Sequence, residues 1–354
     1  MGQLSKLGSG PFVIRAVDIP TAGFGELLVK VESSALNPVD WKIQTRGIFI
    51  TEYPAVLGLD AAGIVVGFGR GVSGFAIGDR VFTEGAFDNA HATFQQYILA
   101  DADITAKIPY KLSFDDAAAL PVSVVTAALG LFNRDDPASS AALFPPWERG
   151  GRGKYAGKPM MIFGGTTSVG QIVIQLTKLS GFSPIIVTAS LHNAKLLKSY
   201  GATHVLDRRL SASELRSAVT DITSLPVKTV YDAVGLRDTQ NAAYDILAPS
   251  GTLVVVLDDA VDPSKKTPEK KIVRAEGDTY AVENRRTSAS LFGQLTSLLE
   301  RGLIKPNRVE VLPSGLAGIP EGLERLSNNE HPPDALYTVF FHIDFRNCCD
   351  YPWT

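Results

Sequence analysis

The chain has 354 residues, of which 45% are hydrophobic and 20% are charged, and these are ordinary values for a folded globular protein. Its length suggests two domains of roughly 150 residues each. The net charge of −3 counts against a general electrostatic nucleic-acid binder. Because there is no run of about 18 apolar residues, we expect no membrane span. The first residues also lack the apolar segment of a secretory signal.

The two cysteines, Cys348 and Cys349, are adjacent near the end of the chain. Adjacent cysteines bond to each other only with strain, and such a bond would close no loop. We therefore interpret them as incidental thiols in a reducing compartment and predict a cytoplasmic protein.

Short apolar runs broken by Gly and Pro extend from about residue 12 to 110 and predict a small irregular β-domain. The predicted strands of this part lie at 27–31, 61–69, 79–82 and 94–100. An Ala- and Leu-rich helix is predicted next, over 114–132, with Ser113 as its N-cap.

A loop is predicted from composition at 133–159, and loops of that length are usually functional or disordered. After it, predicted strands at 160–163, 184–190, 204–207, 229–235 and 252–258 alternate with helices at 168–181, 194–201, 213–222, 239–247 and 288–302. This alternation predicts a doubly wound parallel sheet with helices on both faces. A strand-like run at 336–343 suggests that the chain returns to the first domain. We therefore predict a discontinuous β-domain of residues 1–118 and 304–354 around a second domain of residues 119–303.

The sequence GGTTSVG at 164–170 joins the first strand of the parallel sheet to its helix. Backbone N–H groups and the helix dipole make such a strand–turn–helix junction a pyrophosphate site. Gly165 and Gly170 would let backbone and ligand approach closely. We predict dinucleotide contacts from Gly164, Gly165, Thr167, Ser168, Val169 and Gly170. The alternative is a tight turn that only packs the helix on the sheet.

The residues after the second strand of this sheet bear on the choice of dinucleotide. An NAD site usually places Asp or Glu there, to bind the ribose 2′-hydroxyl. Here the strand ends at Ser190 without a carboxylate, and Lys195 follows. Hydroxyl, amide and cationic groups suit a 2′-phosphate instead. We therefore predict NADP(H), held by Ser190, His192, Asn193 and Arg208, with Arg209 as a further source of charge.

Four segments carry a resemblance to a known family: ALNPVDWK at 35–42, the block at 53–82, LPVSVVTAALGLF at 120–132 and the glycine turn. Together they resemble the medium-chain dehydrogenase/reductase superfamily. The resemblance implies an α/β chain in which a GroES-like β-domain is interrupted by a doubly wound Rossmann-type parallel-sheet domain.

Zinc-dependent members of this family bind a catalytic zinc through Cys, His and acidic residues. The matching positions here are Asn37, Leu59 and Asp60, so the thiolate and imidazole that zinc prefers are missing. A four-cysteine structural zinc site is excluded by the cysteine count. The histidines show no ligand spacing in the sequence: His91, His192, His204, His331 and His342. We therefore predict no metal.

The resemblance to zinc-less members implies reduction of an activated carbon–carbon double bond, with NADPH giving hydride to the β-carbon of an enone or enoyl thioester. Two subgroups remain open, quinone oxidoreductases and fungal trans-acting enoyl reductases that serve polyketide synthases. The second subgroup is the better match at three places: residues 35–42, the Pro-rich loop predicted at 133–159, and residues 190–193. A small or carrier-bound substrate, a polyketide synthase partner, and a monomer or homodimer are implied. The divergent tail after residue 327 keeps a non-catalytic NADPH-binding sensor or scaffold as a third alternative.

The resemblance also implies roles for individual residues. Lys42 and Thr126 are the predicted catalytic residues. Contacts near the nicotinamide or the substrate are implied for Val39, Asp40, Trp41, Lys42 and Leu257. Each has a plainer alternative: a surface lysine for Lys42, a helix hydroxyl for Thr126, a turn residue for Asp40 and a core side chain for Trp41.

Overall fold

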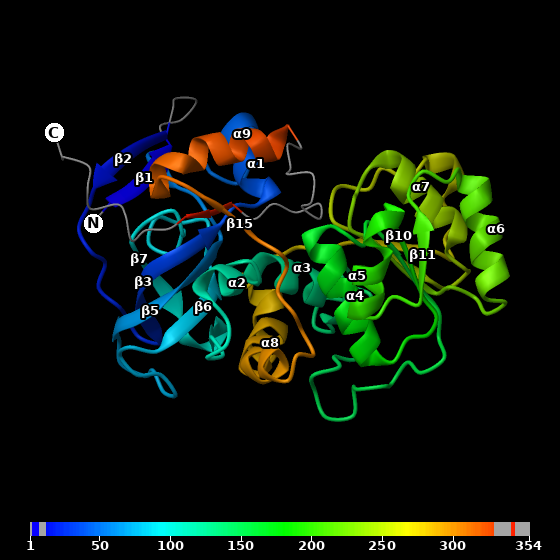
Figure 1. Ribbon diagram of the computed structural model, residues 1–354, viewed down its shortest axis with the longest axis horizontal. Coiled ribbons are helices and arrows are strands. Elements are labelled where there is room, and N and C mark those ends of the chain that lie inside the picture. The colour runs from blue at the N-terminus through cyan, green and yellow to red at the C-terminus, as the bar shows by residue number, and fades with distance from the viewer. Residues whose placement is uncertain (1, 7–11, 329–340, 344–354) are drawn as a thin grey trace. The chain divides into compact units, whose positions relative to one another are not determined.

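The computed structural model describes residues 2–6, 12–328 and 341–343 (Figure 1). The chain divides into two compact units. Unit 1 comprises Met1–Val122, Leu295–Glu300 and Pro306–Thr354, and unit 2 comprises Ser123–Gln294 and Arg301–Lys305. The adjacent cysteines and most of the divergent tail lie outside the described residues.

The described part of unit 1 contains a seven-stranded sheet in the order β15-β16-β3-β5-β6-β8, with β7 also paired to β3. Its strands are β3 (Glu26–Ala35), β5 (Asp60–Phe68), β6 (Arg80–Glu84), β7 (Tyr97–Asp101), β8 (Thr105–Lys107), β15 (Glu310–Leu312) and β16 (Phe341–Ile343). A smaller sheet has the order β2-β1-β4, from β1 (Gly2–Lys6), β2 (Phe12–Ala16) and β4 (Ala55–Val56). All four predicted strand runs correspond to strands of the larger sheet.

Unit 1 has a core built from alternate strand residues and from two helices that contact each other, α1 (Pro38–Arg46) and α9 (Ile319–Ser327). Along β3, Leu27, Val29 and Val31 are buried in this core. Helix α9 adds Leu323 and Leu326, whose spacing places them on one face of the helix.

The predicted helix over 114–132 is two helices, α2 (Phe114–Ala118) and α3 (Pro121–Phe132). Ser113 caps the first, accepting a hydrogen bond from the Asp116 N–H at 3.0 Å. Pro121 stands at the first position of the second helix, where its missing N–H costs nothing. In the described part of the chain, Phe114–Phe132 is the one helical stretch long and apolar enough to cross a membrane, and 72% of its most apolar window is buried. Its apolar character is therefore explained by packing.

The described part of unit 2 contains a six-stranded parallel sheet in the order β11-β10-β9-β12-β13-β14, as the alternation of strand and helix predicts. Its strands are β9 (Met160–Phe163), β10 (Ile185–Ala189), β11 (His204–Asp207), β12 (Thr229–Asp232), β13 (Thr252–Val255) and β14 (Lys271–Arg274). The last strand was not predicted, because two apolar residues between two charged ones give a weak signal.

Helices cover both faces of this sheet (Figure 1). They are α4 (Ser168–Ser180), α5 (Ala194–Tyr200), α6 (Ala212–Ile222) and α7 (Arg237–Ile246), and α8 (Val282–Glu300) follows the sheet. Helices α6 and α7 share a buried cluster with Met161, Val230 and Leu253. Helix α4 packs on the opposite face, where Thr177 contacts Met160. The predicted doubly wound architecture is confirmed.

Candidate functional site

The glycine turn connects β9 to α4 at the carboxyl edge of the parallel sheet. Thr167 is the N-cap of α4, and its Oγ1 accepts a hydrogen bond from the Gly170 N–H at 3.0 Å. The same hydroxyl donates to the Gly164 carbonyl at 2.9 Å. Gly164 has φ +73°, a left-handed conformation that favours glycine. The first turn of α4 is thereby held where the unpaired N–H groups of a helix N-terminus can receive a phosphate.

Gly165 and Gly170 lie in tightly packed surroundings inside the protein. A Cβ on Gly165 would lie 2.0 Å from Val187 Cγ1, and a Cβ on Gly170 would lie 2.1 Å from the Gly164 carbonyl oxygen. Both distances are far shorter than any van der Waals contact. The two glycines therefore let α4 pack tightly on the sheet, which fixes the helix N-terminus beside the turn.

The end of β10 lies next to the glycine turn, because the Gly165 N–H donates to the Thr188 carbonyl at 3.0 Å. Ser190 is half-buried and His192 is exposed. Asn193 is 7% exposed, and its Nδ2 is a buried donor for which the described residues offer no acceptor. A buried donor without a partner carries a free-energy cost that an acceptor oxygen of a bound nucleotide would remove. This position therefore fits the adenosine end of a dinucleotide.

A carboxylate that sequence reasoning missed lies beside this position. Asp207 ends β11 and is paired in register with Ala189, the last residue of β10. Arg209 Nη2 lies 2.7 Å from Asp207 Oδ2 and holds the pKa of Asp207 down at about 2. Arg208, predicted to contact the cofactor, is exposed, and its N–H donates to the Ala189 carbonyl at 3.0 Å. The charge of Asp207 is thus balanced by its neighbour two residues along the chain.

Two further groups of unit 2 lie at the same edge of the sheet. Asp232 ends β12, and its Oδ1 accepts hydrogen bonds from the N–H groups of Val234 and Gly235 at 2.9 and 3.1 Å. Burial raises the pKa of Asp232. A Cβ on Gly235 would lie 2.9 Å from Leu257 Cγ, so Leu257 packs against this turn. Leu257 remains 38% exposed, which leaves its surface available to a ligand.

Thr126 lies inside α3 rather than at its N-terminus, and it is 9% exposed. Its carbonyl accepts a hydrogen bond from the Tyr231 hydroxyl at 3.0 Å. Its own hydroxyl faces Gly277, where an added Cβ would approach Thr126 Oγ1 to 2.3 Å. Gly277 therefore leaves room for the Thr126 side chain.

The predicted nicotinamide-end residues of unit 1 belong to α1. Val39 and Trp41 are partly buried and pack against the core of the unit. Lys42 is half-buried, with its Nζ 5.7 Å from the centroid of the Trp41 ring. Arg46 stands over the same ring at 5.5 Å. Trp41 therefore packs against the core and lies near two cations of α1, and its contact with a cofactor stays a prediction.

Asp40 is fully buried in α1. Its Oδ2 accepts the Asn37 N–H at 2.7 Å, which caps the helix. Burial raises the pKa of Asp40 to about 8 against the opposing effect of this bond, and the charge of Asp60 adds to the rise. The carboxyl therefore has the turn role that the sequence kept as an alternative, and its contact with a cofactor stays a prediction.

At the three positions that match zinc ligands of zinc-dependent family members, the polar side chains are hydrogen-bonded within the protein. Asn37 Nδ2 donates to Asp60 Oδ2 at 2.7 Å, and the Val122 N–H donates to Asp60 Oδ1 at 2.7 Å. Burial raises the pKa of Asp60 to about 7, although these two bonds lower it in part. Leu59 offers no ligand atom from its side chain. An amide, an alkyl group and one carboxylate do not fit the sulfur and nitrogen ligands that zinc prefers.

Strand pairing brings together a group of potential metal-ligating side chains that their spacing in the sequence did not indicate. Single ligand atoms of Glu26, His91 and Asp101 lie within 4.8 Å of one another. Glu26 and Asp101 are paired in register across β3 and β7, and His91 Nε2 lies 3.4 Å from Glu26 Oε1. Burial of His91 disfavours its charged form, but Asp88 and the other two carboxylates outweigh this effect and raise its pKa. The facing carboxylates therefore favour the protonated form of His91, and the absence of metal stays a prediction.

The comparisons with known proteins agree with this architecture. A family model described as an alcohol dehydrogenase GroES-like domain matches residues 23–110, and one described as a zinc-binding dehydrogenase matches residues 168–276. The crystal structure of an alcohol dehydrogenase superfamily protein from Novosphingobium aromaticivorans superposes with a TM-score of 0.78 at 23% identity, covering 97% of this chain and 99% of that one. This likeness concerns the fold.

Two fungal relatives match over most of their length. The dehydrogenase azaJ of Aspergillus niger is 31% identical over 328 residues, which cover 89% of this chain and 91% of the relative. The trans-enoyl reductase grgB of a Penicillium species is 30% identical over 332 residues, which cover 87% of this chain and 88% of the relative. The chain therefore belongs to the medium-chain dehydrogenase/reductase superfamily, a family of oxidoreductases that use a nicotinamide dinucleotide.

Proposed function

We propose that this protein is an NADPH-dependent reductase of an activated carbon–carbon double bond in an enoyl thioester or enone, and that it works without zinc. One observation carries the proposal. In a chain 30% identical to a trans-enoyl reductase, the positions of the zinc ligands hold Asn37 and Asp60, which are bonded to each other at 2.7 Å. Without a Lewis acid to bind an alkoxide, reduction of a conjugated double bond is the chemistry that fits best.

NADPH held by the turn residues 164–170 would supply the hydride that adds to the β-carbon, and solvent would supply the proton that adds to the α-carbon. Negative charge develops on the carbonyl oxygen during hydride transfer, so a positioned donor or cation lowers the barrier. We assign this task to Lys42, whose charge is held beside Trp41 on α1. We assign to Thr126 the positioning of the nicotinamide, because its side chain is nearly buried and faces Gly277.

The preference for NADPH over NADH is proposed from the residues around the end of β10. The strand ends without a carboxylate, and Asn193 offers a buried donor. The nearby Asp207 is paired with Arg209, which reduces its repulsion of a 2′-phosphate. We therefore keep Ser190, His192, Asn193 and Arg208 as the proposed contacts of that phosphate. The turn residues 164–170 are the proposed contacts of the pyrophosphate.

We further propose that the acceptor is a small molecule or an acyl group carried as a thioester by a polyketide synthase. The support is the similarity to a protein named as a trans-enoyl reductase. The oligomeric state, monomer or homodimer, and the cytoplasmic location stay predictions.

The direct test is NADPH oxidation by the purified protein with a 2-enone, with a crotonyl thioester and with a benzoquinone. We expect turnover with one of the first two acceptors and a saturated product at the former double bond. Turnover with the quinone alone would replace the proposal by quinone reduction. Tight NADPH binding without turnover of any acceptor would support a sensor or scaffold. Loss of activity on removal of stoichiometric zinc would contradict the proposed metal independence.

A further inference from the structure

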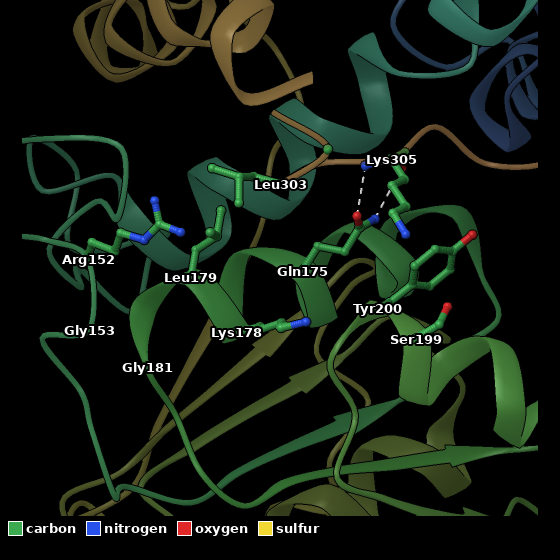
Figure 2. A pocket seen from close by; sticks show the side chains of 11 residues that line it. Arg152, Gly153, Gln175, Lys178, Leu179, Gly181, Ser199, Tyr200, Leu303 and Lys305 are labelled. Carbon is green, nitrogen blue, oxygen red and sulfur yellow. Dashed lines mark hydrogen bonds between the residues drawn. The ribbon is translucent and has the colours of Figure 1, made fainter. Parts of the chain in front are cut away.

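A cavity lies in unit 2 at the C-terminal end of α4, away from the glycine turn. Its volume is about 340 Å³. The walls come from the predicted loop at 133–159, the C-terminal ends of α4 and α5, and the segment 302–305 (Figure 2). The first residue of α4 that lines the cavity is Gln175, about 10 Å along the helix from Ser168 at its N-terminus. The cavity is a separate site from the cofactor site.

Three cationic side chains line this cavity: Arg152, Lys178 and Lys305. Figure 2 shows Arg152 on one side of Gln175 and Lys305 on the other, with Lys178 along the helix below them. Within the described part of the chain no carboxylate lines the cavity, and none of the three cations has an ion-pair partner. One lysine at a helix C-terminus is ordinary because of the helix dipole. Three unpaired cations around one cavity repel one another and attract an anion.

The loop that carries Arg152 is held in place by backbone hydrogen bonds. The Gly153 N–H donates to the Leu179 carbonyl at 3.0 Å, and the Tyr155 N–H donates to the Ser180 carbonyl at 2.8 Å. These bonds satisfy the last carbonyl groups of α4. Because they join the residues next to Arg152 to the helix, they fix the rim of the cavity.

The two lysines are also held by their surroundings. The Gln175 amide makes two hydrogen bonds to the backbone of Lys305, accepting its N–H at 2.8 Å and donating to its carbonyl at 3.1 Å. The stem of Lys178 packs against Gly201, where an added Cβ would lie 2.7 Å from Lys178 Cδ. The backbone that carries each cation is therefore fixed before any ligand binds, which lowers the entropic cost of binding.

We propose that this cavity binds a phosphate-bearing small anion. A guanidinium and two ammonium groups are the side chains that proteins use for phosphate, through charge-assisted hydrogen bonds. The phosphate could belong to a free polyphosphate or to the phosphopantetheine group of a carried thioester substrate, and the second source rests on the proposed function. The shared chemistry of both is a phosphoryl group beside three cations.

The test is isothermal titration calorimetry of the purified protein with inorganic pyrophosphate and, separately, with 4′-phosphopantetheine. The variants are Arg152→Gln, Lys178→Gln and Lys305→Gln, which keep length but remove charge. The matched control is Lys198→Gln, because Lys198 is exposed on α5 and does not line the cavity. The glycine turn can also bind a phosphate, so the binding that all three variants retain is assigned to it.

We expect at least one probe to bind to the wild type and the control, with affinity lowered roughly tenfold by each of the three substitutions. Binding of pyrophosphate alone identifies a free polyphosphate, and binding of phosphopantetheine alone identifies the carried group. Binding of both supports the shared phosphoryl chemistry. The proposal is overturned if the wild type binds neither probe more tightly than the three cavity variants do. It is also overturned if Lys198→Gln weakens binding as much as those variants. Enone reduction is measured separately, so failure of this site and failure of the proposed function are distinguishable.

Discussion

Asn37 and Asp60 are joined by a hydrogen bond of 2.7 Å between two almost completely buried side chains. Asn37→Ala would leave a buried carboxylate oxygen without its donor, so we expect the free energy of unfolding to fall by about 1–3 kcal/mol. Urea unfolding measures this change. The double variant Asn37→Ala/Asp60→Ala should cost less than the sum of the single variants, and strict additivity would show that the bond contributes little.

The pH dependence of stability should report on Asp40. Its folded-state pKa of about 8 lies above the ordinary aspartate value of 3.8, so the folded protein keeps a proton that the unfolded chain releases. The contribution of this group is therefore complete below pH 4 and is lost as the pH rises toward 8, with a slope of up to about 1.4 kcal/mol per pH unit. Asp40→Asn keeps an acceptor for the Asn37 N–H and removes the titration. Unfolding free energies from pH 5 to 8 should decline less steeply in this variant, and an unchanged slope would contradict the assignment.

Gly165→Ala tests the packing of α4 on the sheet. The added Cβ would lie 2.0 Å from Val187 Cγ1, so we expect a loss of about 1–3 kcal/mol in unfolding free energy and weaker cofactor binding. Val187→Ala should recover part of the loss in the double variant. Gly293→Ala is the control, because an added Cβ there meets nothing within 4 Å in a helix. If Gly165→Ala behaved like the control, the close contact would have no energetic importance.

Arg209→Gln tests the charge balance beside β10. The substitution removes the partner of Asp207 and leaves a carboxylate near the proposed 2′-phosphate contacts. We expect the dissociation constant of NADPH to rise roughly three- to tenfold, with a smaller change for NADH. Fluorescence titration measures both constants. Arg216→Gln removes another exposed arginine of unit 2 and should leave the ratio of the two constants unchanged, so an equal effect would point to general surface charge.

Lys42→Ala and Thr126→Val test the proposed catalytic roles. If Lys42 stabilises charge on the carbonyl oxygen, its loss should lower kcat roughly 100-fold, while the NADPH dissociation constant changes little. Thr126→Val keeps the shape of the side chain, so a fall in kcat would report on the hydroxyl. Lys42→Arg and Thr126→Ser should recover activity in part. An unchanged kcat would return the residue concerned to the plainer role considered for it.

Much of unit 2 could be predicted because its elements have strong local patterns. The apolar run 160–163 is a buried strand with the predicted bounds, and the spacing of Val169, Ile172 and Leu176 indicates the helix after the turn. Strand β14 escaped prediction because Ile272 and Val273 alone are apolar in it. Local pattern was therefore enough for the central strand β9 and not for β14.

The contacts of the candidate site were harder to predict, because they depend on cross-strand register. Asp207 lies beside the end of β10 through its pairing with Ala189, and no motif marks that relationship in the sequence. Glu26 and Asp101 are likewise brought together by pairing across two strands. The burial of Asp40 could not be predicted either, because the local sequence does not distinguish a residue that caps a helix from one that contacts a ligand.

The position of β16 between β15 and β3 has a consequence for biosynthesis. His342 pairs with Ala35, so this part of the β-sheet is completed by one of the last described segments to leave the ribosome. The inserted unit ends at Lys305 and is fully synthesised before that. The nascent chain therefore carries an open strand edge on β3 after the inserted unit has been synthesised, and this edge is exposed to aggregation until residues 341–343 emerge.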